Sequence, residues 1–332
     1  MAEALTEKTP DCLGMRNPAR EFPAVESPPG LPARGAASPR SGPQNELRKT
    51  VPRGVCPWTP LLATLFHLGL ASALFVTGFQ PLLALRLTGQ ENPVHTASML
   101  LLVWKLYLLD RALEHPEDAS VHEGNSAAFL RRFPRSSWSL FGVLAAGQLG
   151  LVLLAPELLG AIALSIAVSA FYFVKVPLLG KRAKQLPYFK CFYLSACALV
   201  VVGAFTPGMW RCLTARGLAA ISLSFLLFFL NFSLYDIKDI EGDTRANIKT
   251  FAAALPPQLF LTLHLCLALA LTGVSLALLP GGTGEVLAAV FVFHAAMILW
   301  LRHRPFSAAL CGVIDGGYGL ILGAGTWLLL RH

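Results

Sequence analysis

Long apolar runs separated by short polar breaks constrain this chain more than any other feature of its sequence. From Trp58 onward, nine runs reach or approach the length of about 20 residues that a helix needs to cross a bilayer. They cover approximately residues 60–87, 94–110, 138–155, 157–175, 190–206, 217–235, 254–279, 285–302 and 307–330. Proline and glycine mark many of the breaks, as at Pro134 and at Pro280-Gly281-Gly282. The pattern predicts an all-α integral membrane protein, a bundle of about nine transmembrane helices.

The composition agrees with a membrane protein and argues against a large soluble helical one. Hydrophobic residues make up 55% of the 332 positions and charged residues 14%, too few to solvate the surface of a soluble bundle of this size. The net charge of +8 fits loops that face anionic lipid or diphosphate, and we expect no nucleic-acid partner. The seven cysteines form no C-x-x-C pair, and we interpret them as small hydrophobic residues.

The first 56 residues differ from the rest of the chain. They are rich in Pro, Gly, Ser, Glu and Arg and contain no long apolar run, which predicts a disordered cytosolic tail over 1–56 and a transmembrane domain over 57–332. Most Lys and Arg residues of the later breaks fall on the side of the membrane that the predicted topology gives to this tail. By the positive-inside rule that side is cytoplasmic.

An acidic cluster directly follows the apolar run 217–235. Asp236, Asp239 and Asp243 have the spacing i, i+3, i+7, which places them on one face of a helix. Three like charges on one stripe would destabilise that helix unless a cation lay between them. Oxygen ligands favour a hard ion such as Mg²⁺, which commonly bridges carboxylates to substrate phosphates. We therefore predict a magnesium site here, and the alternative is a solvated acidic helix end.

A second acidic cluster follows the run 94–110. Asp110, Glu114 and Asp118 share one helical face at i, i+4, i+8, although Pro116 should end the helix and bring Asp118 in from a loop. Two acidic groups at the same predicted membrane face suggest one divalent-metal site for a phosphorylated substrate, rather than two ordinary acidic loops. The predicted metal ligands are Asp110, Glu114, Asp118, Asp236, Asp239 and Asp243. All of these except Asp118 are also the predicted catalytic residues.

Basic residues lie on the same predicted side as the acidic clusters. We expect some of them to hold diphosphate oxygens that the metal leaves uncoordinated, and the alternative is simple anchoring at the membrane surface. The predicted diphosphate-binding residues are Lys181, Arg182, Lys184, Lys190 and Lys249.

Two stretches of the chain resemble a known family. Residues 236–243 read D-I-K-D-I-E-G-D and residues 247–250 read N-I-K-T. Together they resemble the second signature of the UbiA superfamily of intramembrane prenyltransferases, a D-x-x-D-x-x-x-D run followed by a Gly-Ile-Lys-Ser/Thr-like stretch. The first signature of that family, N-D-x-x-D-x-x-x-D, keeps its spacing here at residues 110–118. Asp replaces its Asn, Arg111 replaces the neighbouring Asp, and Glu replaces the middle Asp.

The resemblance covers residues 58–332 and implies both a fold and a reaction. The fold would be nine helices around a lipid-accessible central cavity, with the two acidic helix ends facing each other across its cytoplasmic mouth. The reaction would be Mg²⁺-dependent transfer of a prenyl group from a polyprenyl diphosphate to an aromatic or other lipophilic acceptor. Tyr172, whose Tyr-x-x-Lys setting is shifted by one from the family's Tyr-x-x-x-Lys, would line the pocket, as would Asn231 and Tyr235.

Two other functions remain open at this point. Because the first signature is altered, the chain could instead be a UbiA-type terpene cyclase, which ionises the diphosphate without an external acceptor. A transporter or channel is the third possibility. It is disfavoured because transporters place polar residues near the bilayer midplane, whereas this chain concentrates its charge at one membrane face.

Overall fold

The computed structural model describes residues 64–65, 67–112, 130, 134–175, 180–211, 213–245, 247–303, 306 and 308–331. Within these ranges the regular elements are helices, without a strand, which confirms the all-α prediction. The longer ones are α3 (Leu70–Thr88), α4 (Pro93–Ala112), α6 (Pro134–Leu154), α7 (Leu158–Phe173), α8 (Lys190–Ala204), α9 (Ala215–Arg245), α11 (Pro257–Leu278), α12 (Gly282–Leu301) and α13 (Ala308–Arg331). The short ones are η1 (Ala183–Gln185), η2 (Met209–Arg211) and α10 (Phe251–Ala254). The predicted tail, residues 1–56, lies outside the described residues.

The helix ends follow the breaks that the sequence contains. Helix α3 ends at Gly89, whose φ of 72° is the left-handed conformation that glycine adopts without a steric penalty. Prolines stand at the first position of α4, α6 and α11, where a missing N–H removes no helical hydrogen bond. Helix α9 is the longest, at 31 residues, and continues beyond its apolar run through the acidic cluster.

Six helices in the described part of the chain are long and apolar enough to cross a membrane. These are α3, α6, α11, α12, residues Ala215–Ile240 of α9 and residues Ala309–Arg331 of α13. Helices α7 and α8 are apolar but have only 16 and 15 residues, and α4 is not among the six. The structure therefore supports a multi-pass, all-α membrane protein with at least these candidate spans.

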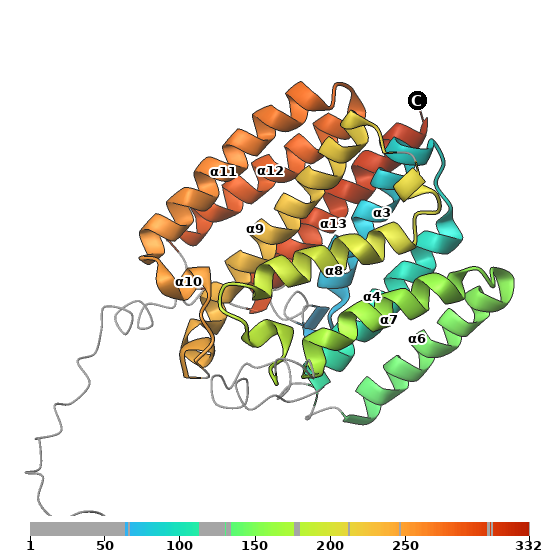
Figure 1. The fold of residues 1–332 in the computed structure, drawn as a ribbon, viewed down its shortest axis with the longest axis horizontal. Coiled ribbons are helices and arrows are strands. Elements are labelled where there is room, and N and C mark those ends of the chain that lie inside the picture. The colour runs from blue at the N-terminus through green and yellow to red at the C-terminus, as the bar shows by residue number, and fades with distance from the viewer. Residues whose placement is uncertain are drawn as a thin grey trace, which may run out of the picture. The chain divides into compact units, whose positions relative to one another are not determined.

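Helix α9 lies at the centre of the packed helices (Figure 1), with contacts to α3, α8, α10, α11 and α12. Aromatic side chains fill its contact with α3, where the ring centroid of Phe228 lies 4.5 Å from that of Phe79 and 5.4 Å from that of Phe75. In contrast, α6 exposes much of its surface, including Val143 and Leu153, in a way that suits contact with lipid. The contacts of α9 with its neighbours bury 67% of its apolar window.

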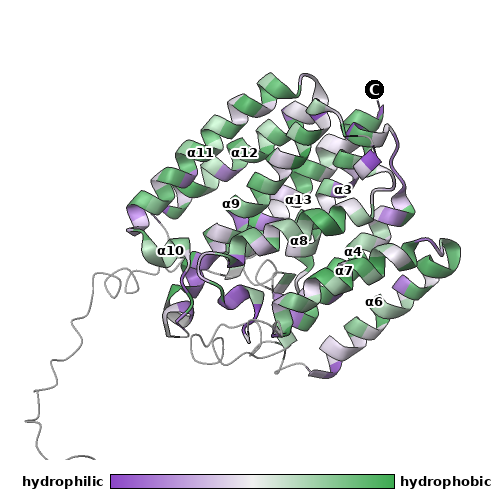
Figure 2. Ribbon diagram, in the orientation of Figure 1, coloured by the Kyte–Doolittle hydropathy of each residue, from purple (hydrophilic) through white to green (hydrophobic). Residues whose placement is uncertain are grey.

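Hydrophilic residues gather where α9 ends and where the chain leads into α8, as Figure 2 shows, whereas α11 and α12 are apolar along most of their length. Because α8 packs directly on α9, the start of α8 can reach the acidic end of α9. The fold thus brings together two charged segments that are far apart in the sequence.

Candidate functional site

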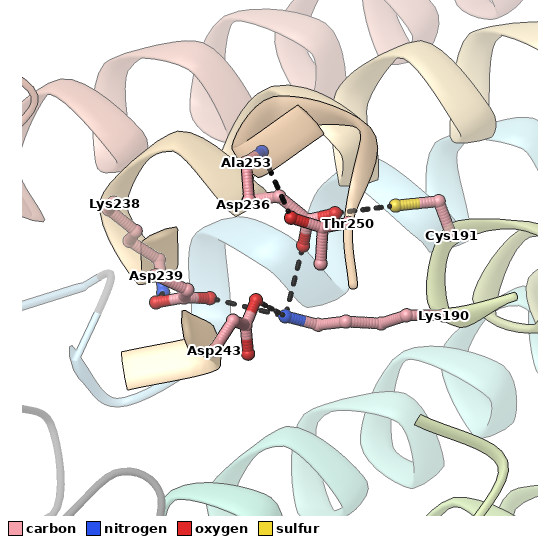
Figure 3. Close-up of polar contacts among 8 residues, drawn as sticks. All are labelled: Lys190, Cys191, Asp236, Lys238, Asp239, Asp243, Thr250 and Ala253. Atoms are coloured by element: carbon pink, nitrogen blue, oxygen red, sulfur yellow. Dashed lines mark hydrogen bonds and ion pairs between the residues drawn. The ribbon is translucent and has the colours of Figure 1, made fainter. Parts of the chain in front are cut away.

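Three aspartates of α9 converge on a single ammonium group. Lys190, the first residue of α8, places its Nζ 3.0 Å from Asp236 Oδ1, 3.6 Å from Asp239 Oδ2 and 3.2 Å from Asp243 Oδ2 (Figure 3). The three acids share one helical face because α9 continues through them as a regular helix. Their carboxylates therefore surround one cation position. We call Lys190, Asp236, Asp239 and Asp243 the cation cluster.

Two carboxylates of the cation cluster are shielded from water, Asp239 is about one-third exposed, and two further residues lie at the edge of the cluster. Asp236 is 2% exposed and Asp243 is 6% exposed. Lys238 Nζ donates to Asp239 Oδ1 at 2.7 Å, and the Cys191 thiol donates to Asp236 Oδ2 at 3.1 Å. Among the described residues, Lys190 and Lys238 are the cations that pair with these carboxylates. Among the residues that the structure describes, the three carboxylates thus outnumber the two ammonium groups that contact them by one charge.

Burial changes the protonation of Asp243, which lies beyond the apolar span of α9. Burial raises the pKa of its carboxyl from 3.8 to about 6, with repulsion from Asp239 and Asp236 acting in the same direction. The Lys190 ammonium opposes this rise but does not cancel it. Asp243 therefore takes up a proton more readily than an exposed aspartate does.

Unusual backbone geometry flanks the cation cluster on both chain segments. Tyr188 and Asn247, with φ of 58° and 55°, are the two non-glycine residues with positive φ in the part of the chain that the structure describes. Tyr188 precedes Lys190 by two positions, and its N–H donates to the carbonyl of Lys249 at 2.8 Å. Asn tolerates this conformation, whereas for Tyr it carries a penalty of about 1–3 kcal/mol, of a kind that often occurs near functional sites. Both segments are thus held in a defined conformation next to the acids.

A second buried polar group links α9 to α3 and α13. Asp315 of α13 is fully buried and accepts hydrogen bonds from Ser72 Oγ at 2.5 Å, from Asn231 Nδ2 at 3.1 Å and from the Tyr235 hydroxyl. Tyr235 also donates to the carbonyl of Cys311 at 3.2 Å. We predicted Asn231 and Tyr235 as pocket residues, and here they tie α9 to α13 immediately before the cation cluster.

The other predicted diphosphate and pocket residues lie in different settings. Lys184 is buried, and its Nζ lies 5.5 Å from the ring centroid of Tyr172 on α7, a cation–π contact. Arg182 immediately precedes η1, and its backbone N–H donates to the side-chain Oε1 of Gln185, the last residue of η1.

Two of the predicted cations are exposed at the surface. These are Lys181, just before η1, and Lys249, just before α10. Among the contacts of the described residues, Lys190 is the predicted diphosphate-binding residue that pairs with Asp236, Asp239 and Asp243.

The first acidic cluster is described only in part. Asp110 is half-buried near the end of α4, which packs against α3, α6 and α7. Glu114 and Asp118 lie outside the described residues. The prediction that the two acidic groups face each other across one site therefore stays a prediction.

The cation cluster fits a divalent metal in the kind of ligands it offers, although not in its present arrangement. Within the described ranges, no group of three or more His, Cys, Asp or Glu residues is arranged to hold a metal ion. Instead the Lys190 ammonium lies among the three carboxylates. An all-carboxylate donor set around a stand-in cation is the chemistry that Mg²⁺ prefers.

Sequence reasoning missed Lys238 and Cys191 as neighbours of the acids. Two neighbours in the sequence could have suggested them: Cys191 directly follows a predicted phosphate-binding lysine, and Lys238 directly precedes Asp239.

Comparison with known proteins gives no identification, since no family model matches the chain and neither a curated protein nor a solved structure matches it significantly.

Proposed function

We propose that this chain is a membrane prenyltransferase with a UbiA-like architecture, which moves a prenyl group from a polyprenyl diphosphate to an aromatic or other lipophilic acceptor. The observation that carries the proposal is the convergence of Asp236, Asp239 and Asp243 on one cation at the end of an apolar helix bundle. A polyprenyl diphosphate matches both environments, because its charged diphosphate suits the carboxylates and their cation and its apolar chain suits the helix bundle.

The residues of the cation cluster have separate roles in this proposal. Asp236, Asp239 and Asp243 would hold Mg²⁺, and Asp110, Glu114 and Asp118 would supply further ligands to it or to a second ion. When bound, Mg²⁺ supplies electrostatic stabilisation to the diphosphate as it departs. Lys190 would donate hydrogen bonds to diphosphate oxygens, and the burial of Asp236 and Asp243 would limit the access of water that weakens these interactions.

The proposed architecture goes further than the six candidate spans. Helices α4, α7 and α8 complete a nine-helix membrane domain whose apolar interior receives the prenyl chain. The acidic C-terminal end of α9 and the start of α8 then form the cytoplasmic mouth of this interior. Support comes from the gathering of hydrophilic residues at this end (Figure 2) and from the apolar character of the helices that extend away from it.

The direct test is incubation of the purified, full-length protein in detergent with radiolabelled farnesyl and geranylgeranyl diphosphates, with Mg²⁺ or with EDTA. A panel of aromatic acceptors is added to half of the reactions. Label that moves to an acceptor only with Mg²⁺ supports the proposal. Mg²⁺-dependent release of a hydrocarbon or terpene alcohol without acceptor identifies the cyclase alternative, which the altered first signature keeps open. Absence of Mg²⁺-dependent turnover of either diphosphate rejects both.

A further inference from the structure

Polar side chains of four helices form a connected group inside the apolar bundle. Each of them has at most 7% of its surface exposed. They are Asn231 and Ser233 of α9, His264 of α11, His294 of α12, and Asp315 and Tyr318 of α13. We call these six residues the polar ring. Polar groups buried within membrane-spanning helices are costly, so they commonly serve a function.

The contacts of the polar ring run from α9 through α13 and α12 to α11. Asn231 Nδ2 donates to Asp315 Oδ1 at 3.1 Å. Asp315 and Tyr318 lie one turn apart on the same face of α13. The Tyr318 hydroxyl is hydrogen-bonded to Nδ1 of His294. The imidazole of His294 stacks on that of His264, with ring centroids 6.1 Å apart and planes inclined by 23°.

The remaining contact returns the polar ring to α9. Nε2 of His264 lies 2.8 Å from the hydroxyl oxygen of Ser233, which follows Asn231 by two positions. Nδ1 of the same imidazole lies 3.0 Å from the carbonyl oxygen of Phe260. Because a carbonyl can only accept, neutral His264 carries its proton on Nδ1, and its Nε2 accepts from Ser233. The polar atoms of His264 are therefore both used.

Two atoms of the polar ring are left over. Within the part of the chain that the structure describes, Asn231 Oδ1 and His294 Nε2 are buried and have no hydrogen-bond partner. Asn231 turns its amide nitrogen to a carboxylate, so the oxygen is the atom that remains. Both residues are 0% exposed. Since roughly 90% or more of buried polar groups in proteins are paired, two such atoms in one connected group indicate a ligand that the chain does not itself supply.

The two atoms define the chemistry of this ligand. Oδ1 of Asn231 can only accept, so the ligand must donate a hydrogen bond. Nε2 of His294 donates if the Tyr318 hydroxyl donates to Nδ1, and accepts if Nδ1 carries the proton instead. A hydroxyl group suits both cases, because it donates and accepts. A charged ligand is disfavoured by the cost of its burial, and the described residues offer no group of three or more His, Cys, Asp or Glu that could hold a metal.

We propose that the polar ring binds the hydroxyl group of a neutral molecule, water or a membrane-soluble alcohol, through Asn231 Oδ1 and His294 Nε2. Both sources supply the same hydrogen bonds, and internal water commonly pairs buried polar atoms in proteins. The proposal involves neither the cation cluster nor any turnover, so it stands or falls independently of the proposed function.

Two measurements on the full chain in detergent distinguish the sources. X-ray radiolysis converts bound water into hydroxyl radicals, which oxidise the side chains beside it, and mass spectrometry locates the products. Bound water predicts oxidation of Tyr318 and His294 although both are 0% exposed. Phe79, equally buried among the rings of Phe75 and Phe228, is the internal control and should stay unmodified.

The second measurement uses a photoreactive analogue of farnesol and its methyl ether. The ether keeps the same chain but cannot donate a hydrogen bond. A bound alcohol predicts that the farnesol analogue labels residues of the polar ring, whereas the ether does not.

Substitutions test whether the two unpartnered atoms hold the ligand. His294→Phe and Asn231→Leu should each reduce the modification of Tyr318 to the level of Phe79. Ser275→Ala is the matched control: it removes a buried hydroxyl of α11 that bonds to the carbonyl of Leu271 outside the polar ring, and should change nothing. If His294→Phe does not fold, His294→Asn replaces it, because an Asn amide can reach the position of Nδ1 but not that of Nε2.

The result in wild type is decisive by itself. Oxidation of Tyr318 assigns water, and labelling by the farnesol analogue alone assigns an alcohol. If neither reagent modifies the polar ring more than Phe79, the proposal is wrong. Equal modification of Tyr318 in wild type, His294→Phe and Asn231→Leu also overturns it, because the ligand would then not depend on these two atoms.

Discussion

Asp315 offers a test of the structure that does not depend on any assigned reaction. Replacement of Asp315 by Leu keeps a side chain of similar size in the same buried position but removes both acceptor oxygens. The donors Ser72 and Asn231, on α3 and α9, then lose the bonds that they make to this carboxylate. Tyr235 keeps a partner, because its hydroxyl also donates to the carbonyl of Cys311 at 3.2 Å.

The expected loss of stability follows from these contacts. Hydrogen bonds between helices in a membrane contribute about 0.6 kcal/mol on average and up to about 1.7 kcal/mol, so the bonds from Ser72 and Asn231 together give about 1–3 kcal/mol. Only the acceptor is removed while the buried donors stay, so the substitution breaks a polar network rather than replacing it by apolar packing. Asp315→Asn keeps one acceptor oxygen in the same shape and is expected to lose less.

The assay is reversible unfolding in mixed detergent micelles, with sodium dodecyl sulfate as the denaturant and helical circular dichroism as the signal. Wild type should be the most stable, Asp315→Asn intermediate and Asp315→Leu the least stable. A Leu variant as stable as wild type would refute the reasoning, because it would mean that burying the carboxylate costs as much as its hydrogen bonds contribute.

The structure makes three other predictions. Asp239→Ala and Asp243→Ala should each abolish Mg²⁺-dependent turnover but leave membrane insertion intact, because both side chains face the Lys190 ammonium and not lipid. Wild-type turnover in both variants would rule out the metal site. The apparent affinity for Mn²⁺ should fall by up to about tenfold for each pH unit below about 6, where Asp243 gains a proton, and should level off above that pH; a flat profile from pH 5 to 7 contradicts this. Gly284→Ala should lower stability in the same unfolding assay, because the added Cβ would lie 1.9 Å from the carbonyl oxygen of Leu279. Gly323→Ala is the control: open space surrounds this position, so the variant should be neutral or more stable by about 1 kcal/mol or less.

Hydropathy predicts the helices well where a break coincides with the end of an apolar run. The run 254–279 becomes α11 because Pro256 and Pro257 set its start, and Leu278 ends it before Pro280. The prediction is less accurate where a helix outlasts its apolar residues. Helix α9 continues well past residue 235 because the backbone hydrogen bonds of a helix do not depend on apolar side chains. The opposite occurs at α3, which begins only after Gly69, a residue with a left-handed φ of 79°.

The acidic face of the site could be read from the sequence, but its partners could not. The spacing of Asp236, Asp239 and Asp243 contains the information that they share a face, since a helix has a fixed period. The identity of the cation between them depends on how α8 packs on α9, and no local pattern links Lys190 to an aspartate 46 positions later. Asp315 is a similar case, because the sequence shows a lone acid in an apolar run without indicating that Ser72 bonds to it.

The most direct test of the central claim is the release of inorganic diphosphate from labelled geranylgeranyl diphosphate, because ionisation is the step that transfer and cyclisation share. Wild type and Asp239→Asn are compared with Mg²⁺ and with EDTA, with and without acceptor. The proposal predicts release by wild type with Mg²⁺, and none with EDTA or with the Asn variant. Release that is equal in Asp239→Asn and wild type, or that persists in EDTA, would contradict the claim that these carboxylates hold the catalytic cation.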